Sequence, residues 1–372
     1  MSDRLVRWSL LALVALLAAT PAAAEPAVTL LDLPFRATAM RGPRSEVAVA
    51  VATSGLIPLA RSAANAAAPD AGEEESAPVV VLWGKDGGAA LSLVDGAIRT
   101  TLLGAEAIEG LAASETPRGA LPGSRRALSG AVSAYLTGPT RAMGAAMPSA
   151  AGLTIRERQP VAMGGDPKPV PVSTVTVSAG PDATFAAARP RAVRLAGHPA
   201  FVAATLLGGD AAGLSLVTRA GIGAWSVAAR TPPQDGAPLR IAAVADFTGT
   251  GRPQVAAILA KGGKLQVWSL SAEAFTLDGE APGYAAGPDD VDLAAVVEGD
   301  DKAAPDLALP AIGGAALALV TLKGGLRERA RIALPAPAGF GVAALGRGRQ
   351  TRILVGLSDG RVAVVAPEGA TP

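Results

Sequence analysis

The sequence predicts an all-β protein built as a β-propeller, a ring of small antiparallel sheets called blades. One observation is that a pattern of short apolar strands and Gly-rich turns recurs through the C-terminal half of the chain. The second is that the copies follow one another at intervals of about 50 residues, a spacing typical of propeller blades rather than of helical repeats. The alternative is a Gly-rich β-sandwich whose hairpins are similar by coincidence, and the regular interval argues against it.

The clearest copy of the repeat runs from Ile241 to Leu270. It contains the strands IAAVA, VAAILA and LQVWSL, with the loop DFTGTGRPQ between the first two and the Gly-Gly hairpin turn KGGK before the third. Similar patterns occupy 192–227, 291–322 and 341–366. The proline of the loop recurs as Pro199, Pro253 and Pro305, and Thr351 takes its place in the last copy.

Strands are also expected in the N-terminal half, but their spacing is irregular. Dividing the chain by about 50 residues predicts seven blades, in a single domain over 25–372. The segment 62–78 is acidic and has no aromatic residue, which predicts a disordered loop. The expected strands are Val28–Leu33, Glu46–Thr53, Val79–Trp83, Ala90–Asp95, Ala127–Leu136, Thr154–Met163 and Val170–Val177.

The first 24 residues have the order of parts found in a secretory signal peptide. Arg4 and Arg7 precede an apolar run from Leu10 to Ala19, and small residues lead up to Ala24. Cleavage is expected after Ala24, which places the protein in the periplasm or outside the cell. An uncleaved anchor is the alternative, but a membrane-spanning helix needs about 20 apolar residues and Pro21 interrupts this run.

Composition excludes several classes of function. The chain has 33 basic and 32 acidic residues, so no global field draws it to nucleic acid or to an anionic membrane. It has no Cys, which excludes disulfides, thiolate nucleophiles and Cys-ligated metals. Its single histidine, His198, stands beside Pro199 in a loop and is expected to be a surface residue.

The segment ADFTGTGRPQV at Ala245–Val255 resembles the FG-GAP or VCBS-type repeat, whose usual loop is D-x-D-G-D-G followed by a proline and a strand. The resemblance extends over about 190–369. Members of this group, which includes the integrin-α head, form β-propellers, usually of seven blades. Many bacterial members are exported proteins of unassigned function. The resemblance therefore implies the fold and says little about activity.

Calcium sites in these repeats depend on several carboxylate oxygens, because a hard cation needs charged oxygen ligands. Here the first ligand position is kept as Asp246, whereas the others are Thr248, Thr250 and Gln254. No cofactor is therefore expected, and Asp246 is expected to accept backbone N–H groups across its turn. The remaining weak metal candidates are Asp300, Asp301 and Asp306, whose spacing does not match the Asp-rich loop.

Two functions from different classes remain open. The sequence has no nucleophile elbow, phosphate loop or zinc motif, which favours a non-catalytic binding or scaffold module for a protein or small-molecule partner in the cell envelope. The alternative is an exported hydrolase or lyase that uses carboxylates and arginines at the central funnel. Acidic and basic side chains converging there, around residues such as Arg252, Arg347 and Asp300, would favour the enzyme.

Overall fold

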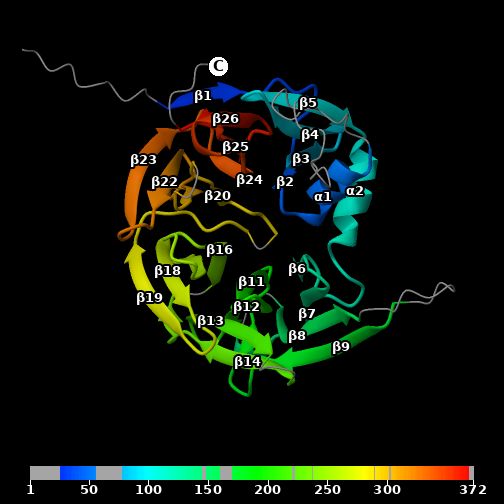
Figure 1. Cartoon of the computed structure of the whole chain (residues 1–372), viewed down its shortest axis with the longest axis vertical. Helices are drawn as coiled ribbons and strands as arrows, with labels where there is room; N and C mark the ends of the chain where they lie inside the picture. Colours follow the sequence, from blue (N-terminus) through cyan, green and yellow to red (C-terminus); the bar gives the residue numbers. More distant parts are fainter. Residues whose placement is uncertain are drawn as a thin grey trace, which may run out of the picture.

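The computed structural model describes residues 26–55, 78–144, 148–159, 170–219, 223–236, 238–288, 290–300 and 303–367. They form a ring of antiparallel four-stranded blades (Figure 1). The predicted all-β propeller is thus confirmed. The signal peptide, and all of the predicted loop at 62–78 except Pro78, lie outside these residues.

Each blade is a four-stranded antiparallel sheet whose strands follow one another from the ring axis outward. In this order, blade 1 contains β2 (Ala39–Arg41), β3 (Val79–Gly84), β4 (Gly87–Val94) and β5 (Ala97–Leu103), and blade 2 contains β6 (Ala127–Ser129), β7 (Val132–Thr140), β8 (Ser149–Arg158) and β9 (Val172–Ser178). Blade 3 contains β11 (Arg191–Leu195), β12 (His198–Leu206), β13 (Ala211–Arg219) and β14 (Trp225–Arg230). Blade 4 contains β16 (Leu239–Ala245), β17 (Gln254–Leu259), β18 (Lys264–Leu270) and β19 (Phe275–Ala281), and blade 5 contains β20 (Ala295–Val297), β21 (Asp306–Pro310), β22 (Ala316–Thr321) and β23 (Arg327–Ala333). Blade 6 contains β24 (Ala338–Leu345), β25 (Arg352–Leu357), β26 (Val362–Ala366) and β1 (Ala27–Leu30).

Two further short strands do not belong to the four-stranded pattern. The strand β10 (Thr184–Phe185) pairs with both β8 and β12 and so links blade 2 to blade 3. The strand β15 (Gln234–Asp235) pairs with β13.

The described residues form six blades, so the expected count of seven is wrong. The inner strands of blades 3 to 6 begin at 191, 239, 295 and 338, close to the interval that the sequence repeat predicts. Blades 1 and 2 begin at 39 and 127, much farther apart, because two helices and long connections separate their strands. The expectation of seven blades wrongly assigned this non-repeating chain to a blade.

The ring closes by pairing the two ends of the described chain. The strand β1 lies antiparallel to β26, with Val28 opposite Val365, and forms the outermost strand of the last blade. The sequence predicts a strand in this region but does not identify its partner. Because this pairing joins the first strand to the last sheet, blade 6 cannot separate from blade 1 without breaking a sheet.

The blades bury apolar faces against one another, and the middle strands show this most clearly. All six residues of β17 are buried. Val255, Ala257 and Leu259 pack in the cluster shared with blade 3, and the alternate residues Ala256 and Ile258 pack in the cluster shared with blade 5. Successive side chains of a strand point to opposite faces of its sheet. Continuous apolar runs are therefore required in the middle strands.

The segment Glu46–Thr53, predicted as a strand, is instead the helix α1 (Glu46–Thr53). The hydroxyl of Ser45 caps it by accepting a hydrogen bond from the N–H of Ala48 at 3.1 Å. Val47, Ala48 and Val51 lie on its buried face and Val49 is exposed, which is a helical spacing, because adjacent residues of a strand point to opposite faces. In the sequence, however, every residue from Val47 to Ala52 is apolar. The alternation of Val and Ala was therefore ambiguous, and the cap and the contact with blade 1 decide for the helix.

The junction between blades 1 and 2 differs from the others. Each of the other five neighbouring pairs shares an apolar cluster of described residues, whereas α1 and α2 (Ala105–Ser114) pack with blade 1 in a cluster that includes no residue of blade 2. Ion pairs bridge this junction. Arg126 donates to Glu46 on α1, and Arg41 on β2 donates to the buried Glu115 at 2.7 Å.

No helix within the described ranges is long and apolar enough to cross a membrane.

Replacing Ser45 with Ala tests the cap of α1. We expect Ser45→Ala to lower the free energy of unfolding by about 1 kcal/mol, because the N–H of Ala48 loses its acceptor. Thermal or denaturant unfolding measures the change. The control is Thr53→Ala at the exposed end of the same helix, for which a change within about 0.5 kcal/mol is expected. Equal effects of the two substitutions would contradict the role of the cap.

Candidate functional site

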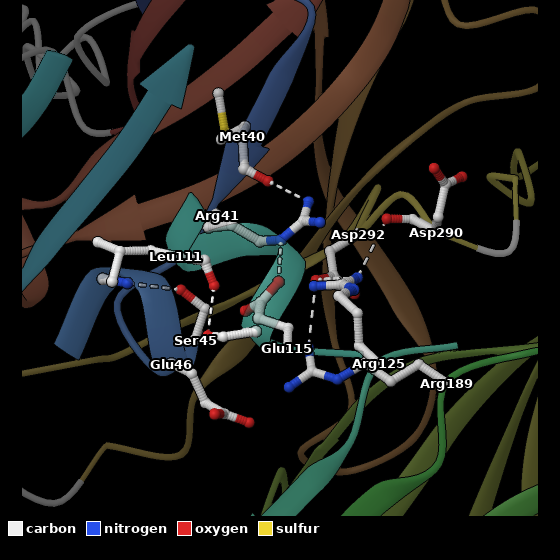
Figure 2. Close-up of polar contacts among 12 residues, drawn as sticks. Met40, Arg41, Ser45, Glu46, Leu111, Glu115, Arg125, Arg189, Asp290 and Asp292 are labelled. Atoms are coloured by element: carbon white, nitrogen blue, oxygen red, sulfur yellow. Dashed lines mark hydrogen bonds and ion pairs between the residues drawn. The ribbon is translucent and has the colours of Figure 1, made fainter. Parts of the chain in front are cut away.

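Three arginines meet one aspartate near the axis that the inner strands surround (Figure 1). Figure 2 shows Arg125, Arg189 and Asp292 of this group. Arg125 lies just before β6, Arg189 and Arg191 flank Pro190 at the start of β11, and Asp292 lies just before β20. Three connections from three blades thus supply the four side chains. We call Arg125, Arg189, Arg191 and Asp292 the central cluster.

Both carboxylate oxygens of Asp292 accept hydrogen bonds within the central cluster. Arg191 Nη2 lies 2.6 Å from Oδ1, and Arg125 Nη2 lies 2.9 Å from Oδ2. Arg189 Nη1 approaches Oδ2 at 3.4 Å. The backbone holds the carboxylate in place, since the carbonyl of Asp292 accepts from the N–H of Val342 on β24.

The central cluster contains more donors and more positive charge than its members can satisfy. Three guanidinium groups face one carboxylate. The Arg125 side chain is only 4% exposed, and its Nε and Nη1 have no hydrogen-bond partner. The Nε atoms of Arg189 and Arg191 are also buried without a partner. Asp292 and Arg191 are each 20% exposed, so the cluster is still open to solvent on one side.

The pKa values of Asp292 and Arg189 are both lowered, but from different causes. Burial by itself would raise the pKa of Asp292, but the charges of Arg191, Arg125 and Arg189 hold it well below its ordinary value. Burial and the neighbouring charge of Arg191 lower the pKa of Arg189 to about 10. At neutral pH Asp292 is therefore ionised and Arg189 is protonated, so neither group is poised to transfer a proton.

A small cavity of about 30 Å³ lies against the central cluster. Arg189, Arg191 and Asp292 line it together with Arg240 and the apolar side chain of Ile258. On the other side of the cluster, Arg41 pairs with Glu115, and its guanidinium carbon lies 5.2 Å from the centre of the Trp83 ring. Figure 2 shows this pair beside Arg125. The charges of Arg41 and Glu115 compensate each other.

The loop that resembles the FG-GAP repeat closes on its own hydrogen bonds. As expected, Asp246 accepts from backbone N–H groups of its turn, with Oδ1 3.1 Å from the N of Thr250 and Oδ2 2.6 Å from the N of Gly251. Gln254 accepts from the N–H of Phe247 at 2.7 Å and donates to the hydroxyl of Thr248 at 3.0 Å. A side-chain amide can make both bonds, whereas a carboxylate could make only the first.

The other acidic candidates have structural contacts. Asp306 is buried at the start of β21 and pairs with Arg329. The carboxylate of Asp300 lies so close to Gly348 that a side chain at 348 would collide with it, and the positive φ of Gly348 also favours glycine. Asp301 lies outside the described residues. No group of three metal-ligating side chains is found within the described ranges.

The arginines that the sequence singled out are not in the central cluster. Arg252 is exposed and lines a cleft of about 300 Å³ between blades 4 and 5, together with Thr248 and Leu326. Arg347 is exposed in the connection between β24 and β25. His198 is exposed at the start of β12. Charged side chains do converge at the ring axis, but other residues supply them.

Sequence reasoning missed the central cluster because its members are far apart in the chain. Arg125 and Asp292 are separated by 167 positions. A signal was nevertheless present: the pairs Arg125-Arg126 and Arg189-Pro190-Arg191 stand directly before inner strands. In a propeller all inner strands surround one axis, so charges at their ends come close together.

Comparison with known proteins concerns the fold alone. No family model and no curated protein matches this chain. Among solved structures, the β-propeller domain of Myceliophteria thermophila Cps50 (Swd1) is similar with a TM-score of 0.46 and 10% identity, over 91% of this chain and 99% of that one. A luciferin-regenerating enzyme is similar with a TM-score of 0.40 and 9% identity, over 92% and 95%. Trypanosoma rangeli sialidase has a TM-score of 0.38 and 13% identity, and this chain spans about half of it, 52%.

Replacing Asp292 with Asn tests the electrostatics of the central cluster. At pH 7 we expect Asp292→Asn to cost about 3 kcal/mol of unfolding free energy, because it leaves three largely buried guanidinium groups without a counter-charge. The folded-state pKa of Asp292 is depressed, so its contribution is fully present above the unfolded value near 3.8 and is lost as pH falls through the folded value. The difference from wild type, measured by denaturant unfolding, should thus be constant from pH 7 to 5 and shrink below pH 4. A pH-independent difference would contradict this account.

Adding and removing calcium tests the repeat loop. Both carboxylate oxygens of Asp246 already accept N–H groups, so we expect the same thermal midpoint in EDTA and in millimolar calcium. A ligand that binds only the folded state raises the midpoint. A rise of several degrees with calcium would mean that carboxylates assemble a metal site.

Proposed function

We propose that this chain is an exported, non-catalytic β-propeller of the FG-GAP or VCBS type that holds a protein or small-molecule partner at the axis of its ring. The observation that carries the proposal is the central cluster, where three guanidinium groups converge on one carboxylate and retain buried N–H donors without partners. Unused donors in a partly exposed site can bind a ligand.

Protonation states favour binding over acid or base catalysis. A general base works best with a pKa near the working pH, whereas the pKa of Asp292 is held well below its ordinary value by the arginines around it. Burial and the charge of Arg191 lower the pKa of Arg189 to about 10. Arg189 therefore still carries its proton at neutral pH. The cluster thus supports positioning of a charged group rather than proton transfer.

The alternative is an exported hydrolase or lyase at the same place. It is supported by the convergence of acidic and basic side chains at the ring axis, which is the arrangement expected of an enzyme on this fold. A substrate that replaced one of the contacts within the central cluster would change the electrostatic environment of the remaining side chains. The two functions differ in one observable property: a binding protein returns its ligand chemically unchanged.

Ligand capture with product analysis separates the two functions. The mature chain, immobilised, is incubated with extract of the producing cells, and retained molecules are identified by mass spectrometry immediately and after prolonged incubation. We expect at least one retained molecule that stays intact and that is lost from Arg189→Gln but not from the control Arg347→Gln, whose side chain is exposed outside the central cluster. Conversion into products by wild type alone would establish the enzyme instead. No difference between the two variants would overturn the central site.

The proposed export makes a separate prediction about the N-terminus. When the full chain is expressed in a Gram-negative host, we expect the processed protein in the periplasmic or extracellular fraction, with Glu25 as its first residue. Mass spectrometry of the intact protein measures this. An unprocessed chain in the cytoplasmic fraction would contradict the proposal, and replacing the apolar residue Leu13 with Arg provides a control that should block export.

A further inference from the structure

The central cluster is not balanced within itself, and this imbalance indicates what it binds. Asp292 neutralises one of three guanidinium charges, and its two oxygens are both already bonded. Three of the buried N–H positions without partners are the Nε atoms of Arg125, Arg189 and Arg191, and the fourth is Nη1 of Arg125. A buried donor without a partner costs free energy, and a buried charge without a counter-charge costs more. An added anion would relieve both costs.

We propose that the central cluster is the binding site for a carboxylate group of the partner, which enters the adjoining cavity and pairs with the donors of Arg189 and Arg191 that Asp292 leaves unused. This inference rests on the proposed function and deepens it by naming the chemical group that is recognised. The partner is therefore a molecule with an accessible carboxylate.

Asp292 shows that the arginines can hold a carboxylate. Its Oδ1 accepts from Arg191 and its Oδ2 from Arg125, so two guanidinium groups bind opposite oxygens of one planar group. Charge-assisted bonds of this kind are about twice as strong as neutral ones. Phosphate sites, in contrast, commonly use backbone N–H groups at a helix N-terminus. The neighbouring helix α2 instead has its C-terminal cap, Glu115, beside the cluster.

The space beside the central cluster limits how much of the partner can enter. The adjoining cavity of about 30 Å³ is lined by the polar side chains of Arg189, Arg191 and Asp292 and also by Ile241 and Leu293. This volume holds about one or two water-sized groups. The two oxygens of a carboxylate match that size, whereas a whole sugar ring does not. The remainder of the partner must stay outside the cavity.

Sodium acetate serves as the simplest probe of the site. Thermal unfolding of the mature wild-type protein is followed from zero to 100 mM acetate, with ionic strength held constant by sodium chloride. We expect acetate to raise the midpoint by about 2 °C or more. Parallel series with sodium sulfate and sodium phosphate should give smaller shifts. A larger shift with phosphate or sulfate would overturn the assignment to a carboxylate.

Three variants locate the effect. Arg189→Gln keeps a polar side chain and removes one of the three like charges, so it should fold and should lose most of the acetate shift. Arg347→Gln, at an exposed position away from the central cluster, should retain the full shift. Asp292→Ala removes the internal carboxylate, so acetate should stabilise this variant more strongly than wild type. An equal acetate shift in all variants would overturn the proposal.

The outcome can be separated from a failure of the proposed function. If a partner is retained intact through the central cluster but acetate has no effect on wild type or on Asp292→Ala, the carboxylate assignment is wrong and the binding function stands. If acetate binds as expected but wild type converts the retained molecule, the carboxylate site belongs to an enzyme. If neither the acetate shift nor the retention of any molecule is lost in Arg189→Gln, both proposals are wrong.

Discussion

The structure depends on the burial of blade faces against neighbouring blades. A middle strand such as β17 presents alternate residues to two neighbouring blades, so both faces of its sheet are covered there. Such a sheet needs a neighbouring sheet on each face. A set of such sheets meets this requirement for every member when it closes into a ring. The pairing of β1 with β26 provides this closure, because it ties the start of the described chain to the last blade. Small side chains follow from the same constraint, since neighbouring sheets approach closely wherever Ala fills the interface.

The junction between blades 1 and 2 is the exception that the ring accommodates. There the apolar surface of blade 1 is covered by α1 and α2 rather than directly by the next blade. Two ion pairs, Arg126 with Glu46 and Arg41 with Glu115, then connect this helical layer to the strands around it. Ion pairs with largely buried members contribute less net stability than apolar contacts of the same area. We therefore infer that this junction is the least strongly held part of the ring.

The central cluster follows from the fold in a different way. Inner strands approach the axis from every blade, and the connections that precede them bring side chains into a small shared volume. Charges gathered there are partly removed from water, which strengthens both their attraction and their repulsion. The mutual repulsion of three arginines around one aspartate lowers the stability of the fold. Burial and the charge of Arg191 accordingly lower the pKa of Arg189. Residues that cost stability at a shared site are more readily explained by ligand binding than by folding.

Local patterns in the sequence determined the propeller, the two middle strands of blades 3 to 6 and the role of Asp246. Apolar runs, Gly-Gly turns and a side chain that accepts bonds from its own loop all act over a few residues, so they can be recognised without a structure. The tertiary structure alone decided the number of blades, the helical state of Glu46–Thr53 and the central cluster. An apolar run of Val and Ala suits either a strand or a helix, and the Ser45 cap together with the contact with blade 1 selects the helix. Arg125, Arg189, Arg191 and Asp292 come together because the ring is closed, and no local pattern encodes a distance between residues so far apart in the chain.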